Sequence, residues 1–181
     1  MKRATPLLLL VAVALAACGG KTLDTKNVEK DIQKLASQDG VETAVECPEE
    51  VSDADKGKTY ECEITYAGNE NNKQTVEMKI GDNDESEFVD QQAATDEGSI
   101  RQIVAESDAN PASVCEHLSE DLLEQLGGDD CPTQAEEQDD GKPDNIKSIE
   151  VEGDTATMVT DQSTTTFERS EDGSWVATAI E

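Results

Sequence analysis

Five cysteines have the widest choice of chemistry in this 181-residue chain, because a thiol can bind metal, form a disulfide or carry an acyl group. A zinc site needs ligands only a few residues apart, and no two cysteines here are that close. His117 is the single histidine. The sequence therefore predicts no metal site and no cofactor. An odd number of cysteines also indicates that one differs in role from the other four. The five are Cys18, Cys47, Cys62, Cys115 and Cys131.

The first of these cysteines follows a segment with the layout of a secretory signal. Lys2 and Arg3 precede an apolar run from Pro6 to Ala17, and Cys18 comes next. A basic start, a short apolar stretch and small residues before the cleavage point are typical of exported proteins. The apolar run is about a dozen residues long, which is shorter than the roughly 20 needed to span a bilayer. We therefore expect residues 1–17 to be removed on export.

The last residues of that leader, Leu15-Ala16-Ala17-Cys18, resemble the lipobox of bacterial lipoproteins. The resemblance implies that fatty acids such as palmitate are attached through Cys18. Two or more acyl chains hold a protein stably on a membrane. Residues 18–22 would then be a lipidated tether, and the lipid bilayer would be a partner at the extracytoplasmic face of the cell membrane. An ordinary cleaved signal with a free Cys18 is the alternative.

The four remaining cysteines are expected to oxidise in pairs, because an exported chain leaves the reducing cytosol. Four cysteines allow three pairings. Their clustering along the chain favours Cys47–Cys62 and Cys115–Cys131, with one bridge in each half.

The formal net charge of −28 restricts the partners of this chain. Nucleic acids and anionic lipid headgroups would be repelled, so neither is expected to bind. Exposed acids that keep a tethered domain soluble, or that suit a saline habitat, explain the charge more simply than a cation site. The segment Asp82 to Glu87 faintly resembles a calcium loop but carries Glu87 where such a loop needs glycine. Weak calcium binding by the acidic surface stays open.

The first half of the mature chain predicts one helix and an antiparallel sheet. Val28, Ile32 and Leu35 recur at helical spacing from Thr25 until Gly40 ends the segment. Three strand-like pieces follow, and the polar segment 67–72 joins the last two as a hairpin. These pieces are Val41–Glu46, Lys58–Tyr66 and Lys73–Ile80.

Several of these residues resemble a small domain of unknown function that is common in actinobacterial lipoproteins. The resemblance rests on Cys47-Pro48 and on the glycine, the aromatic strand and the second cysteine in Gly57-Lys58-Thr59-Tyr60-Glu61-Cys62. It covers residues 23–82 and implies a helix packed on a sheet with the two cysteines bridged. It implies no known activity.

The second half predicts helices followed by a sheet. Residues 83–97 are acidic and weakly patterned, so we expect a linker whose end turns helical. Ile100, Ile103 and Val104 then indicate a short helix, which Pro111 ends. A stripe from Val114 to Leu126 predicts a further helix, and residues 133–145 an acidic loop. The predicted strands are residues 146–151, 155–160, 163–169 and 174–180.

Residues 98–181, with a last strand that begins Asp172-Gly173-Ser174-Trp175-Val176, resemble a trimmed nuclear-transport-factor-like cone fold. Such a sheet is concave, so Trp175 is a possible ligand-cleft residue. A single tryptophan at a strand start is more often part of the core. The predicted architecture is thus α+β, with two small domains that each pack helices on an antiparallel sheet and each hold one disulfide.

Catalysis is disfavoured by the scarcity of suitable groups. His117 is the only imidazole and lies beside the apolar stripe, and Tyr60 and Tyr66 both belong to the first half. We therefore predict no catalytic residues. The expected function is a non-catalytic cell-envelope module that binds another envelope protein or a small ligand. A carboxylate-dependent enzyme in the second half is the alternative, together with a weakly calcium-responsive surface protein.

Overall fold

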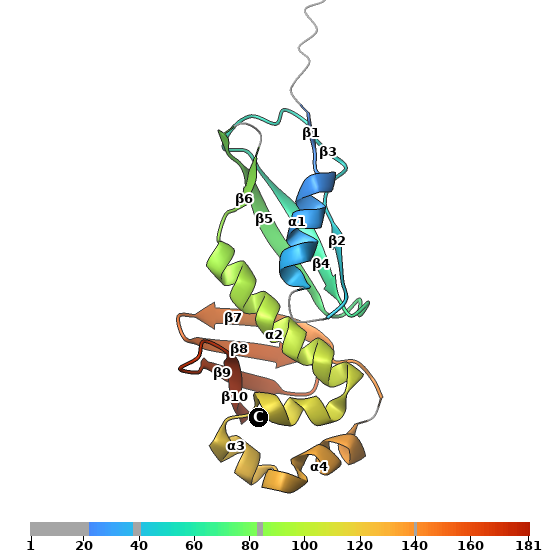
Figure 1. Ribbon diagram of the computed structural model, residues 1–181, viewed down its shortest axis with the longest axis vertical. Helices are drawn as coiled ribbons and strands as arrows, with labels where there is room; N and C mark the ends of the chain where they lie inside the picture. Colours follow the sequence, from blue (N-terminus) through green and yellow to red (C-terminus); the bar gives the residue numbers. More distant parts are fainter. Residues whose placement is uncertain (1–21, 38–40, 83–84, 140) are drawn as a thin grey trace, which may run out of the picture.

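The computed structural model describes residues 22–37, 41–82, 85–139 and 141–181. These residues form two four-stranded antiparallel sheets, a small two-stranded ladder and several helices. Figure 1 shows the two sheets at different heights along the long axis, with the helix α2 crossing between them. The α+β class predicted from the sequence is confirmed. Among the described residues, no helix combines the length and apolar character needed to cross a membrane.

The first sheet has the strand order β2-β4-β5-β6. Its central hairpin consists of β4 (Thr59–Tyr66) and β5 (Lys73–Ile80). Alternate residues of both strands are buried, so one face of the sheet lies on the core while the other meets solvent. The shorter strands β2 (Thr43–Glu46) and β6 (Ser86–Phe88) form the edges. Strands β1 (Leu23–Asp24) and β3 (Glu50–Val51) pair with each other beside this sheet.

Helix α1 (Lys26–Ala36) packs against this core through Ile32, which is buried. Asp24 accepts a hydrogen bond from the backbone N–H of Lys26 at the start of the helix, 3.0 Å away. Ser37 ends the helix, and its backbone N–H and hydroxyl both donate to the carbonyl of Gln33. The predicted apolar stripe of α1 is only partly buried, because Leu35 remains 47% exposed.

Helix α2 (Gln91–Ala109) is the longest element and packs against both sheets. Asp90 caps its first turn by accepting a hydrogen bond from the N–H of Ala93 at 2.9 Å. Ala105 joins the core of the first sheet, whereas Ile100 and Val104 join the core of the second. Because it contributes side chains to both cores, α2 is shared by the two sheets.

The predicted linker over residues 83–97 is therefore corrected. Strand β6 occupies residues 86–88, and α2 begins at Gln91. A helix covered on two sides shows no single apolar stripe, and three of its buried residues are polar or charged: Asp96, Arg101 and Gln102. Local hydropathy could not separate such a segment from a solvated linker.

The second sheet is a meander with the order β10-β9-β8-β7. Its strands are β7 (Ile146–Glu152), β8 (Thr155–Thr160), β9 (Thr164–Arg169) and β10 (Trp175–Ile180). Gly153 and Gly173 adopt positive φ angles of 65° and 91° in two of the connecting turns, which glycine tolerates best. The strands agree with the predicted ranges to within a residue.

The helical segment before this sheet differs from the single helix that the stripe predicts. It consists of a 3₁₀ helix, η2 (Pro111–His117), and a short helix, α3 (Glu120–Gln125). Leu118 separates them because it is extended and bridges to Ala177 of β10, whose carbonyl accepts the N–H of Ser119 at 2.8 Å. The pairing with the sheet thus overrides the helical spacing of the leucines.

The predicted loop over residues 133–145 is also partly helical. After a short 3₁₀ turn, η3 (Gly128–Asp130), helix α4 (Cys131–Gln138) carries a proline in its first turn, where the missing N–H costs no hydrogen bond. The acidic composition of this segment concealed the helix.

Both expected disulfides are present. Cys47, just after β2, is bonded to Cys62 in β4, and their Cα atoms are 4.3 Å apart. Cys115 of η2 is bonded to Cys131 at the start of α4, with a Cα separation of 6.1 Å. The first bridge fastens an edge strand to the hairpin, and the second holds α4 against η2.

Candidate functional site

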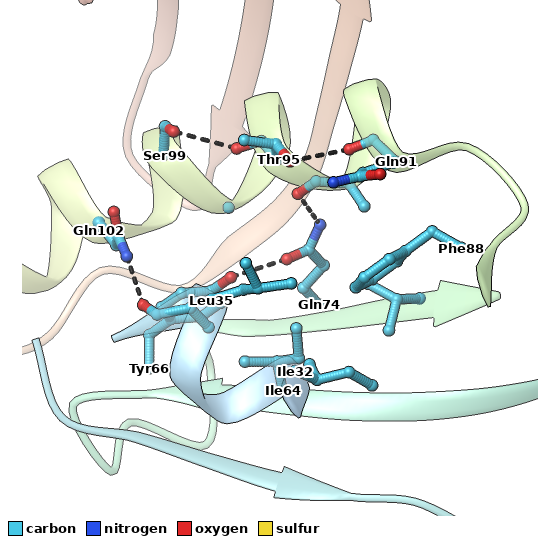
Figure 2. Close-up of a pocket in the computed structure, with 14 residues that line it drawn as sticks. Ile32, Leu35, Ile64, Tyr66, Gln74, Phe88, Gln91, Thr95, Ser99 and Gln102 are labelled. Carbon is cyan, nitrogen blue, oxygen red and sulfur yellow. Dashed lines mark hydrogen bonds between the residues drawn. The ribbon is translucent and has the colours of Figure 1, made fainter. Parts of the chain in front are cut away.

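A cavity of about 140 Å³ lies between α1, α2 and the first sheet. Figure 2 shows α2 on one side of it, the end of α1 on another, and side chains of the strands forming the floor. The two helices lie on the same face of the sheet. The space between them is therefore bounded by α1, by α2 and by the strands of the sheet.

The described residues that line this cavity carry no charged side chain. This is unusual because 31% of the residues in the chain are Asp, Glu, Lys or Arg. The described walls of the cavity are therefore uncharged in a chain of high net negative charge. The apolar part of the lining is contributed mainly by Ile32, Leu35, Ile64, Val76 and Phe88.

Part of the polar lining is a chain of two hydrogen bonds, and the rest is Gln91, Thr95, Ser99 and Gln102 of α2. The Tyr66 hydroxyl donates to Gln74 Oε1 at 2.7 Å, and Gln74 Nε2 donates to the carbonyl of Ala94 at 2.8 Å. The side chains of Tyr66 and Gln74 are about 1% exposed. Burial raises the pKa of Tyr66 well above its ordinary value, outweighing the opposite influence of the Arg101 charge. The phenol therefore stays protonated and acts as a donor.

Gly98 allows α2 to approach this pair. A Cβ atom at this position would lie 2.9 Å from Tyr66 Oη and 3.4 Å from Gln74 Oε1. The first distance is closer than side-chain carbons normally come to an oxygen, so a larger residue would displace either α2 or the buried Tyr66 hydroxyl. Gly98 thus permits the close approach of α2 to Tyr66.

Two more hydrogen bonds hold α2 in place on the C-terminal side of Gly98. Asn72, which is fully buried, donates from Nδ2 to the carbonyl of Arg101 at 2.9 Å. Within α2 itself, the Arg101 guanidinium donates to Glu97 Oε1 through Nε and Nη2 at 2.9 and 2.7 Å. Gln102, which is also buried, donates from Nε2 to the carbonyl of Ala36 and links α2 to the end of α1. The cavity is therefore braced by specific hydrogen bonds.

The comparisons with known proteins bear on this region. Residues 8–85 match the family model of a domain of unknown function, DUF4333. The matched range includes residues 23–82, where the sequence predicts a small domain of unknown function. No curated protein matches the chain, and neither does any solved structure. The DUF4333 region supplies α1 and the floor of the cavity, whereas Gly98 and Gln102 lie beyond it.

The residues singled out from the sequence lie elsewhere. Cys18 is outside the described residues. Trp175 is 3% exposed and belongs to the core of the second sheet, which agrees with the alternative of a core residue. The Arg169 guanidinium covers its ring at 4.3 Å from the centroid. The indole Nε1 has no hydrogen-bond partner among the described residues. His117 is partly exposed, and its Nε2 lies 3.2 Å from Glu106 Oε2.

The expected absence of a metal site stays a prediction. Within the described part of the chain, no three His, Cys, Asp or Glu side chains are grouped to hold a metal ion. Residues 83–84 of the calcium-like segment are outside that part.

Sequence reasoning missed the cavity, although one signal pointed to it. Gln74 shares the buried face of β5 with Val76, Met78 and Ile80, and a polar residue in phase with an apolar strand face indicates a buried hydrogen bond. The positions of Gly98 and Gln102 could not be inferred, because the helix that carries them was expected to be partly linker.

Proposed function

We propose that this protein is a lipid-anchored cell-envelope protein that acts by binding, without catalysis, outside the cytoplasmic membrane. The observation that carries the proposal is the distribution of the cysteines. Four of the five are paired in two disulfides, which leaves Cys18 as the single thiol for acylation. Disulfides of this kind belong to an oxidising compartment, and the lipobox-like leader provides the route to it.

The neutral cavity supports binding over catalysis. A general base or nucleophile must be able to exchange a proton near the operating pH. Tyr66 is the one titratable residue among the described lining residues, and burial keeps its phenol protonated and bonded to Gln74. Asp96, the buried carboxylate of α2, is paired with Arg169 at 2.7 Å. Neither group is placed to act as a free base.

The acidic surface fits the same function. A high net negative charge keeps a tethered domain soluble and away from an anionic membrane surface. The anchor would then hold the protein at the bilayer, while charge repulsion holds the folded part in the aqueous phase.

The intact mass of the protein extracted from membranes tests this proposal. We expect a chain that begins at residue 18, carries a diacylglyceryl group with or without a third acyl chain, and lacks the four hydrogens lost in two disulfides. The Cys18→Ala variant should lose the lipid mass and leave the membrane fraction. Ser119→Ala is a suitable control, because it changes a helix cap far from the leader and should remain in the membrane fraction. A cytoplasmic chain that keeps Met1 and has reduced thiols would refute the proposal.

A further inference from the structure

We propose that the cavity between α1 and α2 is a binding site for a neutral small molecule that inserts one ring-sized apolar group. This inference deepens the binding role proposed above and rests on it. The volume of the cavity, the absence of charge among its described lining residues and the hydrogen bonds that fix its shape support it.

The volume sets the size of the inserted group. An apolar cavity of roughly 150 Å³ in another protein stays dry and binds benzene. The present cavity has a similar volume, about 140 Å³, and is lined in part by Ile, Val and Phe side chains. It can therefore accept one aromatic ring or a short branched aliphatic group, but not a fused ring system or a long acyl chain in full.

The lining selects for a neutral ligand. A charged group moved out of water needs a counter-charge, and none of the described lining residues supplies one. An anion would also be repelled by the net charge of the chain. A cation would be drawn to the protein surface, but it would lose its hydration inside the cavity without gaining a carboxylate. Both kinds of ion should bind more weakly than a neutral molecule of the same shape.

The polar groups indicate which way the ligand points. At the floor, Tyr66 bonds to Gln74, and Gln74 bonds to the backbone of α2. A ligand therefore needs no donor or acceptor at this end of the cavity. Gln91, at one end of the cavity in Figure 2, is exposed, whereas Gln102 at the other end is buried and already bonded to α1. The apolar group should therefore lie inside, with a hydroxyl or amide group directed toward the mouth.

The hydrogen bonds around the cavity fix its shape. The Tyr66–Gln74–Ala94 chain ties α2 to the sheet, and the Gln102 bond to Ala36 ties α2 to the end of α1. A ligand that fills the space would gain contacts with the apolar lining without breaking these bonds.

Titration with simple probes tests the proposal. The protein is the mature chain of residues 18–181 with Cys18→Ala, which retains every described residue and needs no detergent. The probe is benzyl alcohol, compared with benzoate and benzylamine as its anionic and cationic analogues. Calorimetry and the NMR shifts of the Ile32, Ile64 and Val76 methyl groups report binding. We expect saturable binding of benzyl alcohol, with each charged analogue at least ten-fold weaker.

A pair of neighbouring substitutions locates the site. Ala94→Leu adds a side chain that projects into the cavity and should weaken benzyl alcohol binding ten-fold or more. Ala93→Leu makes the same change at the adjacent, exposed position and should leave the affinity unchanged. If Ala94→Leu impairs folding, Leu35→Ala at the exposed mouth replaces it, with Leu126→Ala, another exposed leucine, as its control. Leu35→Ala should weaken binding several-fold and Leu126→Ala should not.

The proposal is overturned if benzyl alcohol gives no saturable binding, if the charged analogues bind equally well, or if a folded Ala94→Leu or Leu35→Ala protein binds as the parent does. These results are independent of the anchor. The mass measurement detects the lipid without any ligand, and the titration examines the cavity in a chain without lipid. Failure of one proposal therefore cannot be mistaken for failure of the other.

Discussion

Tyr66→Phe removes a single hydroxyl from the floor of the cavity and should be markedly more destabilising than the same change at Tyr60. Both tyrosines lie in β4, and each donates one hydrogen bond of 2.7 Å. They differ in their acceptors. Tyr66 bonds to Gln74, whose side chain is about 1% exposed, whereas Tyr60 bonds to the partly exposed Ser86. The comparison therefore isolates the effect of burial.

The magnitude follows from what each substitution leaves behind. After Tyr66→Phe, Gln74 Oε1 is buried without its donor, which costs about 1–3 kcal/mol. After Tyr60→Phe, water can reach Ser86, so only the net worth of one hydrogen bond is lost, at most about 1 kcal/mol. For a chain of this size, a loss of about 2 kcal/mol lowers the melting temperature by roughly 4–8 °C. The double variant Tyr66→Phe/Gln74→Leu should lose less stability than the sum of the losses of the two single variants, because Gln74→Leu removes the unpaired acceptor.

Urea denaturation of the mature chain, followed by circular dichroism, measures these differences as shifts of the midpoint at constant slope. Equal costs for Tyr66→Phe and Tyr60→Phe would mean that water reaches Gln74 through the cavity. The reasoning that the floor is sealed from solvent would then be wrong.

Two further predictions concern charge. Burial raises the pKa of Tyr60 and Tyr66 above the ordinary 10.0, so the folded chain keeps protons that the unfolded chain loses. The contribution of these tyrosines to the free energy of unfolding should be complete below pH 10.0 and should fall as the pH rises above it. The urea midpoint of Tyr66→Phe should therefore fall less steeply with pH than that of the parent. Separately, Arg169→Met leaves the buried Asp96 carboxylate without its cation and should cost about 3 kcal/mol, the low end for a buried pair, since Gln92 still donates to it. Asp96→Asn should restore most of that loss, and a matching Lys147→Met change at an exposed pair should cost much less than Arg169→Met.

The sheets could be predicted from the sequence because each has one buried and one solvated face. Such a sheet produces strict alternation, which is visible in β4 from Tyr60 to Tyr66 and in β5 from Gln74 to Ile80. Short turns then fixed the ends of the strands. The cysteine pairing could also be predicted, because each pair is close in sequence and distant from the other, and both bridges were found.

The helices were harder to predict because tertiary contacts determine them. The leucine stripe from Val114 to Leu126 has helical spacing throughout, but Leu118 is extended because it pairs with β10. In α2, Asp96 and Arg101 resemble surface residues in the sequence, although each is buried beside a partner of opposite charge. Only the partners, which come from the fold, reveal that these positions are interior.

The shared helix also limits what the family match can imply about binding. The DUF4333 region ends at residue 85, before α2 begins at Gln91. It supplies the apolar floor and one side of the cavity, while the opposite side comes from Gly98 and its neighbours. The cavity therefore requires both parts of the chain, and α2 is held by the second sheet through the Arg169–Asp96 pair. It follows that the walls of the cavity are shared between the matched region and α2, and that a change in the second sheet that moves α2 would alter the shape of the cavity.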